Sequence, residues 1–201
     1  EDGKVVLGVI GCPNLPETII SNLEHSGVVG GLFSAIKGVG SYYAPLFEDP
    51  ASFSPFLEQE RIFMKQHTSP KDLVVAEGVE KGHSSHSTQL QIKAKLGFDP
   101  TTVSRQTLNL DSQVKYCVLA KGQADIYLRL PISSTYREKI WDHAAGNVLV
   151  YESGGVVGDV DGNELDFGKG RTLASQGVIA GNKAVFKLVI EAVKEVLKLE
   201  K

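Results

Sequence analysis

The pattern of apolar and polar positions changes near residue 70. Before that point, short apolar runs are separated by glycines, which is typical of strands joined by turns. Residues 5–10 are predicted as a strand, and Gly31–Ile36 with Ser41–Tyr43 as an antiparallel pair. Residues 15–29 are predicted as a surface loop, and the proline-rich segment 44–70 as a connecting stretch.

From residue 71 onward, apolar runs of strand length alternate with segments of helical spacing. This alternation predicts an α/β fold, a layered sheet with helices on both faces. It also divides the chain into residues 1–70, the end of a first sheet domain with its connector, and residues 71–201, an α/β domain. The predicted strands are 73–76, 107–110, 125–130 and 177–180, and the predicted helices are 84–96, 112–121, one beginning at Asp142 and one capped by Asn182.

The string Ile140-Trp141-Asp142-His143-Ala144-Ala145-Gly146 predicts a helix start. Asp142 is expected to cap the first free amides, where the helix dipole favours a negative charge. Trp141 is expected to fix the helix by burial. The small residues that follow leave the first turn nearly bare, so that a ligand or another backbone can come close. Gly154 and Gly155 are expected to end the helix.

The first residues predict a turn. Glu1-Asp2-Gly3 is a strong hairpin signal, and the strand that leaves it needs a partner on the other side of the turn. The only methionine is Met64, so the sequence does not begin with an initiator. We therefore expect this chain to be the C-terminal portion of a larger protein.

The amino-acid composition argues against nucleic acid and membranes as binding partners. The net charge is −3 and the isoelectric point is near 6.0, which gives no footprint for nucleic acid or an anionic membrane. No apolar run approaches the roughly 18 residues of a membrane span. Cys12 and Cys117 lie in apolar surroundings without metal-type spacing, and we expect reduced core thiols of a cytoplasmic protein. The complete protein is expected to be a monomer.

Polar residues gather where the predicted strands end. His83 follows the first strand after residue 71, Ser112 and Lys115 follow the second, and Arg129 follows the third. Asp142 begins the next helix. Ligands of open α/β sheets bind at the carboxyl ends of strands, so these residues could meet in one crevice. Taken singly, each also has an ordinary explanation as a cap, a solvated charge or a loop histidine.

Several segments together resemble one family. Trp-Asp-x-Ala-Ala-Gly followed by Gly-Gly resembles the C-terminal signature of the lithium-sensitive, magnesium-dependent phosphomonoesterases, the inositol monophosphatase superfamily. The segments 80–86 (EKGHSSH), 110–116 (LDSQVKY) and 127–131 (YLRLP) are similar to its 3'(2'),5'-bisphosphate nucleotidase branch. The resemblance implies an α-β-α-β-α sandwich, of which this chain holds the C-terminal sheet domain and the end of the first.

The resemblance also implies a reaction and its residues. His83, Ser112, Lys115 and Arg129 would contact the nucleotide or its phosphates, and Asp142 would bind Mg²⁺ and touch the scissile phosphate. The complete enzyme would remove the 3'-phosphate of adenosine 3',5'-bisphosphate to give AMP, and would act on 3'-phosphoadenylyl sulfate. The alternatives are an inositol polyphosphate 1-phosphatase and a non-catalytic nucleotide-binding fragment.

The superfamily's other metal ligands have no counterpart in this sequence. They come from an upstream Glu and from an Asp-Pro-(Ile/Val)-Asp-Gly-Thr motif, whereas Asp99-Pro100 is followed by two threonines. The segment 159–162 (DVDG) is expected to be a surface turn, because the glycine and glutamate that an EF-hand requires are absent. We therefore expect the 201-residue chain alone to be inactive.

Overall fold

The computed structural model describes residues 1–46, 59–79, 86–131 and 133–199. Over these residues the strands form two sheets. The small sheet has the order β1-β2-β3-β4, and the large sheet has the order β6-β5-β7-β9-β8. Among the described residues, no helix is both long and apolar enough to cross a membrane.

The small sheet is antiparallel throughout. The predicted pairing of residues 31–36 with 41–43 is confirmed, with Phe33 opposite Tyr43. The turn predicted at the first residues is present as well, since the amide of Lys4 donates to the carbonyl of Glu1 at 2.9 Å. The strands are β1 (Leu7–Ile19), β2 (His25–Ile36), β3 (Gly40–Pro45) and β4 (Glu60–Ile62).

The loop predicted for residues 15–29 is wrong. Strand β1 continues to Ile19, and β2 already begins at His25. The register of the pair shifts between Cys12 and Pro16 and again before Thr18. Such irregularities break the alternation of apolar and polar residues, so the strand pattern is not visible in the sequence.

The large sheet combines parallel and antiparallel strands. Strands β6, β5 and β7 are parallel, so their carboxyl ends lie at one edge, whereas β9 pairs antiparallel with β7 and β8 pairs antiparallel with β9. Strand β8 was not predicted. Gly154 does end the preceding helix, with a φ of 96°, but Gly155 already starts β8. The strands are β5 (Val75–Glu77), β6 (Thr107–Asn109), β7 (Ile126–Arg129), β8 (Gly155–Gly158) and β9 (Val178–Asn182).

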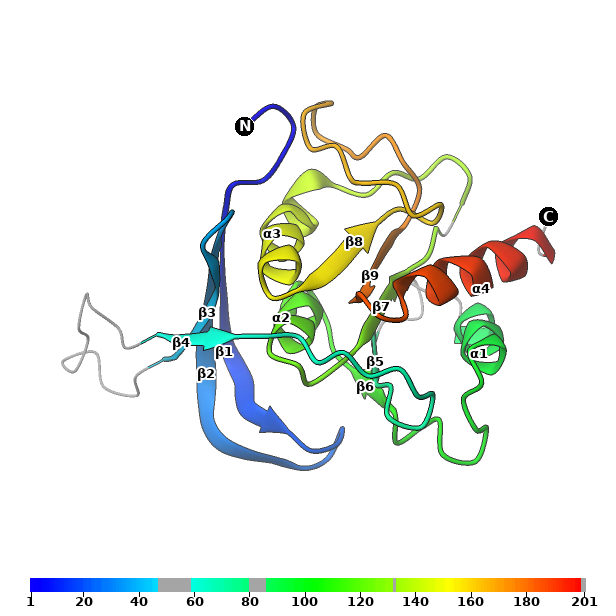
Figure 1. Cartoon of the computed structure of the whole chain (residues 1–201), viewed down its shortest axis with the longest axis horizontal. Coiled ribbons are helices and arrows are strands. Elements are labelled where there is room, and N and C mark those ends of the chain that lie inside the picture. The colour runs from blue at the N-terminus through cyan, green and yellow to red at the C-terminus, as the bar shows by residue number, and fades with distance from the viewer. Residues whose placement is uncertain (47–58, 80–85, 132, 200–201) are drawn as a thin grey trace.

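The helices form two layers (Figure 1). Helices α2 and α3 pack between the two sheets, and α1 and α4 cover the other face of the large sheet. The described layers therefore run sheet, helices, sheet, helices, which agrees with the predicted order of the sandwich. The helices are α1 (His86–Lys95), α2 (Val114–Ala120), α3 (Ala144–Glu152) and α4 (Phe186–Leu199), and a 3-10 turn, η3 (Ile140–Asp142), precedes α3.

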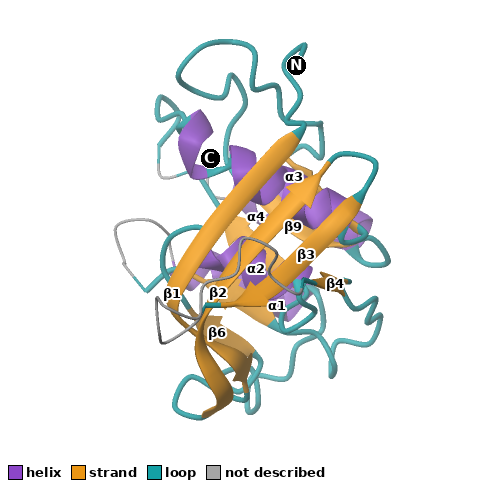
Figure 2. Cartoon of the chain, turned by 90° about the vertical axis from the view of Figure 1, so that its left-hand side faces the viewer, coloured by secondary structure: helices purple, strands orange, loops and turns teal. Residues whose placement is uncertain are grey.

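Each helical layer has its own apolar core. One core joins the small sheet to α2 and α3 and includes Phe33, Tyr116 and Leu149. The other lies under α1 and α4 and includes Ile92 and Val193. The opposite face of the small sheet carries exposed apolar side chains, among them Leu7, Val9 and Ile36. Figure 2 shows this sheet with the helices behind it.

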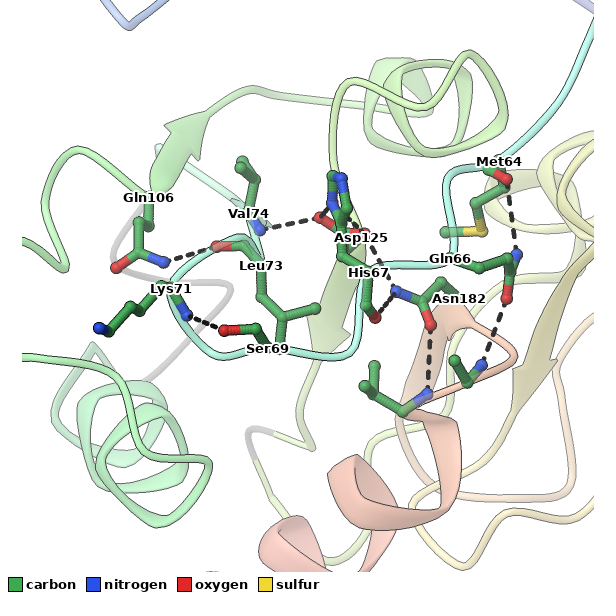
Figure 3. A network of polar contacts seen from close by, with 12 residues as sticks. Met64, Gln66, His67, Ser69, Lys71, Leu73, Val74, Gln106, Asp125 and Asn182 are labelled. Carbon is green, nitrogen blue, oxygen red and sulfur yellow. Dashed lines mark hydrogen bonds and ion pairs between the residues drawn. The ribbon is translucent and has the colours of Figure 1, made fainter.

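A buried carboxylate ties the segment before β5 to the large sheet (Figure 3). Asp125 accepts hydrogen bonds from the amide of Val74 at 3.0 Å and from Asn182 Nδ2 at 3.0 Å. His67 Nδ1 lies 3.2 Å from the same carboxylate. The side chain of Asn182 also bonds the carbonyl of His67 at 2.9 Å and accepts the amide of Val185 at 3.1 Å, just before α4. The network fixes both ends of this segment. Asn182 ends β9, four residues before α4, so its side chain holds the turn that precedes the helix and is not the predicted helix cap.

The two cysteines are buried free thiols, as expected. Their sulfur atoms lie 3.5 Å apart, with Cys12 on β1 and Cys117 on α2. This contact is part of the core that joins the small sheet to the inner helical layer.

Candidate functional site

A pocket of about 490 Å³ opens between β1 and the carboxyl ends of β5, β6 and β7. Four of the five residues predicted to converge line it, namely Ser112, Lys115, Arg129 and Asp142. The fifth, His83, lies outside the described residues. The volume falls within the usual range for small-molecule sites, about 300–1,000 Å³. The pocket also includes Val9, Ile10 and Gly11 of β1, so both sheets contribute to it.

Lys115 is a buried cation rather than a solvated one. Lys115 is 5% exposed, and its Nζ donates to the carbonyls of Leu110 and Ser112 at 3.0 and 2.9 Å. Burial is the largest influence on its pKa and lowers it to about 8. The charge of Asp111 raises this pKa and that of Arg129 lowers it further. Lys115 thus carries a charge that titrates near neutral pH, on the wall of the pocket.

The turn before α2 has an unusual backbone. Ser112 has a φ of 53°, a left-handed conformation that costs energy for a residue with a side chain. Helix α2 begins only at Val114, with Gln113 as its N-cap, so the predicted start at Ser112 and a capping role for it are wrong. Asp111 Oδ1 accepts the amide of Val79 at 3.1 Å and links the loops after β5 and β6. These contacts hold the turn that carries Ser112, a residue that lines the pocket.

A chain of polar contacts runs from the pocket into the core. Arg129 Nε donates to Glu138 Oε1 at 2.9 Å, and the other oxygen of Glu138 lies 3.2 Å from His143 Nε2. His143 Nδ1 lies 2.6 Å from the hydroxyl of Tyr116. Tyr116 packs edge-on against Tyr127, with ring centroids 5.1 Å apart. The side chains of Glu138 and His143 are both 3% exposed, so this series of polar contacts is shielded from solvent.

The charged groups in this series of contacts, Arg129 and Glu138, stabilise one another. Burial acts most strongly on the pKa of Arg129 and lowers it, but the hydrogen bond and charge of Glu138 outweigh burial, so that pKa is raised. Burial likewise raises the pKa of Glu138, yet the hydrogen bonds from His143 and Arg129 bring it below its ordinary value. Arg129 and Glu138 are therefore an ion pair at neutral pH.

Asp142 is not a helix cap. It is the last residue of η3, and the N-cap of α3 is His143, which makes no capping hydrogen bond with its side chain. The carboxylate of Asp142 is exposed on the pocket wall. Trp141 is 50% exposed, so the expected burial is also wrong; the guanidinium of Arg171 lies 5.4 Å from its ring centroid. Asp142 therefore belongs to the wall of the pocket and not to the start of a core helix, whereas Trp141 is exposed and is not among the lining residues.

Gly146 explains part of the small-residue run. A Cβ at this position would lie 2.2 Å from Cδ2 of Tyr116, which is too close for any real contact. At Gly146 the neighbour is thus the ring of Tyr116 from α2. At Ala145 it is the backbone of β1, as expected for this turn, since a Cβ on Gly8 would lie 2.8 Å from the carbonyl oxygen of Ala145. The close approach places the Tyr116 hydroxyl within reach of His143.

The described residues do not by themselves form a metal centre. No group of three or more His, Cys, Asp or Glu side chains within the described ranges could hold an ion. Asp159 accepts the amides of Asp161 and Asn163, both at 2.9 Å, so the segment 159–162 belongs to a turn as predicted. Of the described carboxylates that line the pocket, Asp142 and Asp111 are exposed.

Sequence reasoning missed two buried residues of the pocket wall, Glu138 and His143. Glu138 and His143 lie five residues apart on either side of η3, a spacing that matches neither helix nor strand. Tyr116 and Tyr127 follow the apolar pattern of α2 and β7 and read as ordinary core residues. The strand-end rule, which identified Arg129, does not reach partners that approach it from an irregular segment.

Comparison with known proteins gives a consistent family. The profile of the inositol monophosphatase family matches residues 1–198. The chain is 72% identical over 198 residues to 3'(2'),5'-bisphosphate nucleotidase 1 of Candida albicans (strain WO-1), covering 98% of this chain and 54% of the relative. It is 47% identical over 208 residues to the 3'(2'),5'-bisphosphate nucleotidase of Emericella nidulans, covering 99% and 56%. The chain therefore spans about half the length of these curated relatives.

Solved structures show the same fold at low identity. The Thermotoga maritima IMPase aligns with a TM-score of 0.58 and 22% identity, covering 85% of this chain and 54% of that one. The inositol monophosphate-bound SaIMPase-II aligns with a TM-score of 0.57 and 16% identity, covering 85% and 55%. At such identities the likeness concerns the arrangement of helices and strands.

Proposed function

This chain belongs to the inositol monophosphatase family, and from that premise we propose that it provides the nucleotide-binding wall of a 3'(2'),5'-bisphosphate nucleotidase. The enzyme removes the 3'-phosphate of adenosine 3',5'-bisphosphate to give AMP, and acts in the same way on 3'-phosphoadenylyl sulfate. Relatives of that name are 72% and 47% identical to the chain. The observation that carries the proposal is the pocket in which Lys115 and Arg129 face the same space.

The pocket suits a phosphate ester. Lys115 is desolvated, which makes its attraction to an anion stronger than that of a surface lysine. Arg129 is held through its Nε, and a guanidinium has further N–H donors for phosphate oxygens. The hydroxyl of Ser112 adds a neutral donor at the rim. In this proposal residues 71–201 supply the phosphate contacts, and β1 closes the opposite wall.

The family is generally metal-dependent, and we propose Mg²⁺ as the ion and Asp142 as its one ligand from this chain. A carboxylate beside two phosphate-binding cations repels a phosphate unless another cation intervenes, which supports this role. One carboxylate does not meet the near-octahedral demand of Mg²⁺, and the described residues offer no larger cluster. We therefore expect the chain alone to release no phosphate at a useful rate.

The test compares substitutions at the two cations. Lys115→Ala and Arg129→Ala, in an enzyme that turns over adenosine 3',5'-bisphosphate, should raise KM about ten- to a hundredfold, with kcat less affected, because a hydrogen bond to a charged group contributes about 1.5–3 kcal/mol. Lys194→Ala is a matched control, since Lys194 pairs with Asp161 away from the pocket. Unchanged kinetics in both pocket variants would contradict the proposal.

Two alternatives are separated by the substrate. An inositol polyphosphate 1-phosphatase would release phosphate from inositol 1,4-bisphosphate in preference to the adenosine bisphosphate. A non-catalytic nucleotide-binding fragment would bind AMP in calorimetry without turnover at any magnesium concentration, with or without lithium. Neither alternative is favoured by the comparisons, because relatives 71–72% identical to the chain carry the nucleotidase name.

A further inference from the structure

The pocket wall includes a buried carboxylate that the proposed function leaves without a role. Glu138 precedes η3 in an irregular segment, and its side chain is 3% exposed. One oxygen accepts Arg129 Nε at 2.9 Å, and the other lies 3.2 Å from His143 Nε2. We propose that Glu138 is a positioning residue, which holds the guanidinium of Arg129 in the orientation that binds phosphate. The proposal rests on the proposed function in that the ligand is a phosphate ester.

The geometry fixes Arg129 from one side. A carboxylate with both oxygens engaged by different partners cannot rotate without losing one of them. Glu138 is so engaged, and His143 is held in turn by the hydroxyl of Tyr116 at 2.6 Å. Of the five N–H groups of a guanidinium, Glu138 occupies the one on Nε. A long, otherwise flexible side chain is thereby restricted before a ligand arrives, which lowers the entropy lost on binding.

The same carboxylate couples two walls of the pocket. Arg129 ends β7, whereas His143 directly follows Asp142 and serves as the N-cap of α3. Glu138 contacts both, so it sets the spacing between the phosphate-binding cation and the turn that carries Asp142. A displacement of Glu138 would therefore move Arg129 relative to Asp142.

Stability alone does not explain this arrangement. Taking an ion pair out of water costs several kcal/mol per ion, and a well-packed apolar replacement is often equally stable. Both residues of the buried pair Arg129–Glu138 line the pocket. A role in orienting Arg129 gives the desolvated carboxylate a function that packing would not supply.

The first test is a double-mutant cycle on the polypeptide of this sequence. Affinity for adenosine 3',5'-bisphosphate is measured by calorimetry for the unchanged chain, Glu138→Gln, Arg129→Ala and the double variant, at a temperature where circular dichroism shows each to be folded. Glu138→Gln should weaken binding about ten- to a hundredfold when Arg129 is present, the range found for partners that orient a ligand-binding group. It should weaken binding less than about twofold when Arg129 is absent, because the effect passes through Arg129. An equal loss in both backgrounds overturns the proposal.

Asp125→Asn is the matched control. Asp125 is another buried carboxylate with a histidine partner, but it lies in the network of Figure 3 and does not line the pocket. Its substitution should lower thermal stability and leave the affinity for the nucleotide unchanged. A loss of affinity in Asp125→Asn as large as that in Glu138→Gln would show that general destabilisation accounts for both, and would also overturn the proposal.

A second measurement needs no ligand. In ¹⁵N NMR spectra of the unliganded chain, the Nε–H of Arg129 should exchange slowly with water, and at least tenfold faster in Glu138→Gln. If the unchanged chain binds no nucleotide but shows this protection, the proposed function fails while the placement of Arg129 by Glu138 is supported. If the Nε–H of Arg129 exchanges as fast in the unchanged chain as in the variant, the positioning role is refuted whatever the chain binds.

Discussion

Replacing Gly146 with alanine should destabilise the protein, although glycine is a poor helix former. A Cβ at this position would lie 2.2, 2.3 and 2.8 Å from three carbons of the Tyr116 ring. The ring is 1% exposed and belongs to the core between the small sheet and α2, so it has no open side to move toward. The collision also acts on the hydroxyl of Tyr116, which contacts His143.

The size of the effect follows from two opposing contributions. Alanine in place of glycine inside a helix contributes up to about 1 kcal/mol of stability. Overpacking a rigid core costs about 1–3 kcal/mol, and a contact this short belongs at the upper end. The net loss for Gly146→Ala is therefore about 2 kcal/mol. For a chain of about 200 residues this lowers Tm by roughly 4–8 °C.

The assay is thermal unfolding followed by circular dichroism, with urea unfolding as a second measure. Gly11→Ala is the control, because no atom lies within 4 Å of the Cβ that it would add. We expect its stability to remain within about 0.5 kcal/mol of the unchanged chain. If Gly146→Ala is as stable as the unchanged chain, Tyr116 has room to move, and the explanation given for the small residues at the start of α3 is incorrect.

Three further outcomes are expected. Affinity for AMP should fall as pH rises through about 8, because Lys115 loses its proton there; Lys115→Arg, measured by calorimetry from pH 6 to 10, should abolish that dependence, and a loss that persists in it contradicts the assignment. Asp125→Ala should lower the free energy of unfolding by about 3 kcal/mol or more, since it leaves the amide of Val74 unpaired in a buried network; urea unfolding measures this, and a change below 1 kcal/mol would refute it. Asp142→Asn should leave Tm within about 1 °C while removing most magnesium-dependent turnover of the complete enzyme, because the carboxylate is exposed and caps no helix; near-normal turnover would exclude it as a metal ligand.

The sequence determined the alternation of strands and helices after residue 71. Strands β5, β6, β7 and β9 and the helices between them follow from apolar periodicity and from the glycines that end α1 and α2. The strand-end rule then placed Lys115, Arg129 and Asp142 in one region, because parallel strands bring their carboxyl ends to a single edge. The phosphate-binding role of these residues stays a prediction. These inferences succeeded because they depend on local spacing and on a general property of parallel sheets.

Local pattern failed where the chain is irregular. The two register shifts in β1 interrupt the alternation of apolar and polar residues, so the pairing of β1 with β2 over residues 15–29 is not visible in the sequence. Gly155 fits the pattern of a helix end, but it is the first residue of β8. Asp142 looked like a cap, because an Asp before small residues usually is one, but the intervening η3 moves the start of α3 beyond it.

Only the tertiary structure decided which side chains are buried and what they touch. On an exposed helix Lys115 would be a solvated charge. Its pKa is lowered to about 8 because packing removes water from around it. Glu138 has no periodic relation to Arg129 or His143, and only the meeting of β7, η3 and α3 joins them. Sequence spacing reports which face of an element a residue occupies. Desolvation and long-range pairing depend on how the elements pack, and that information is distributed over the whole chain.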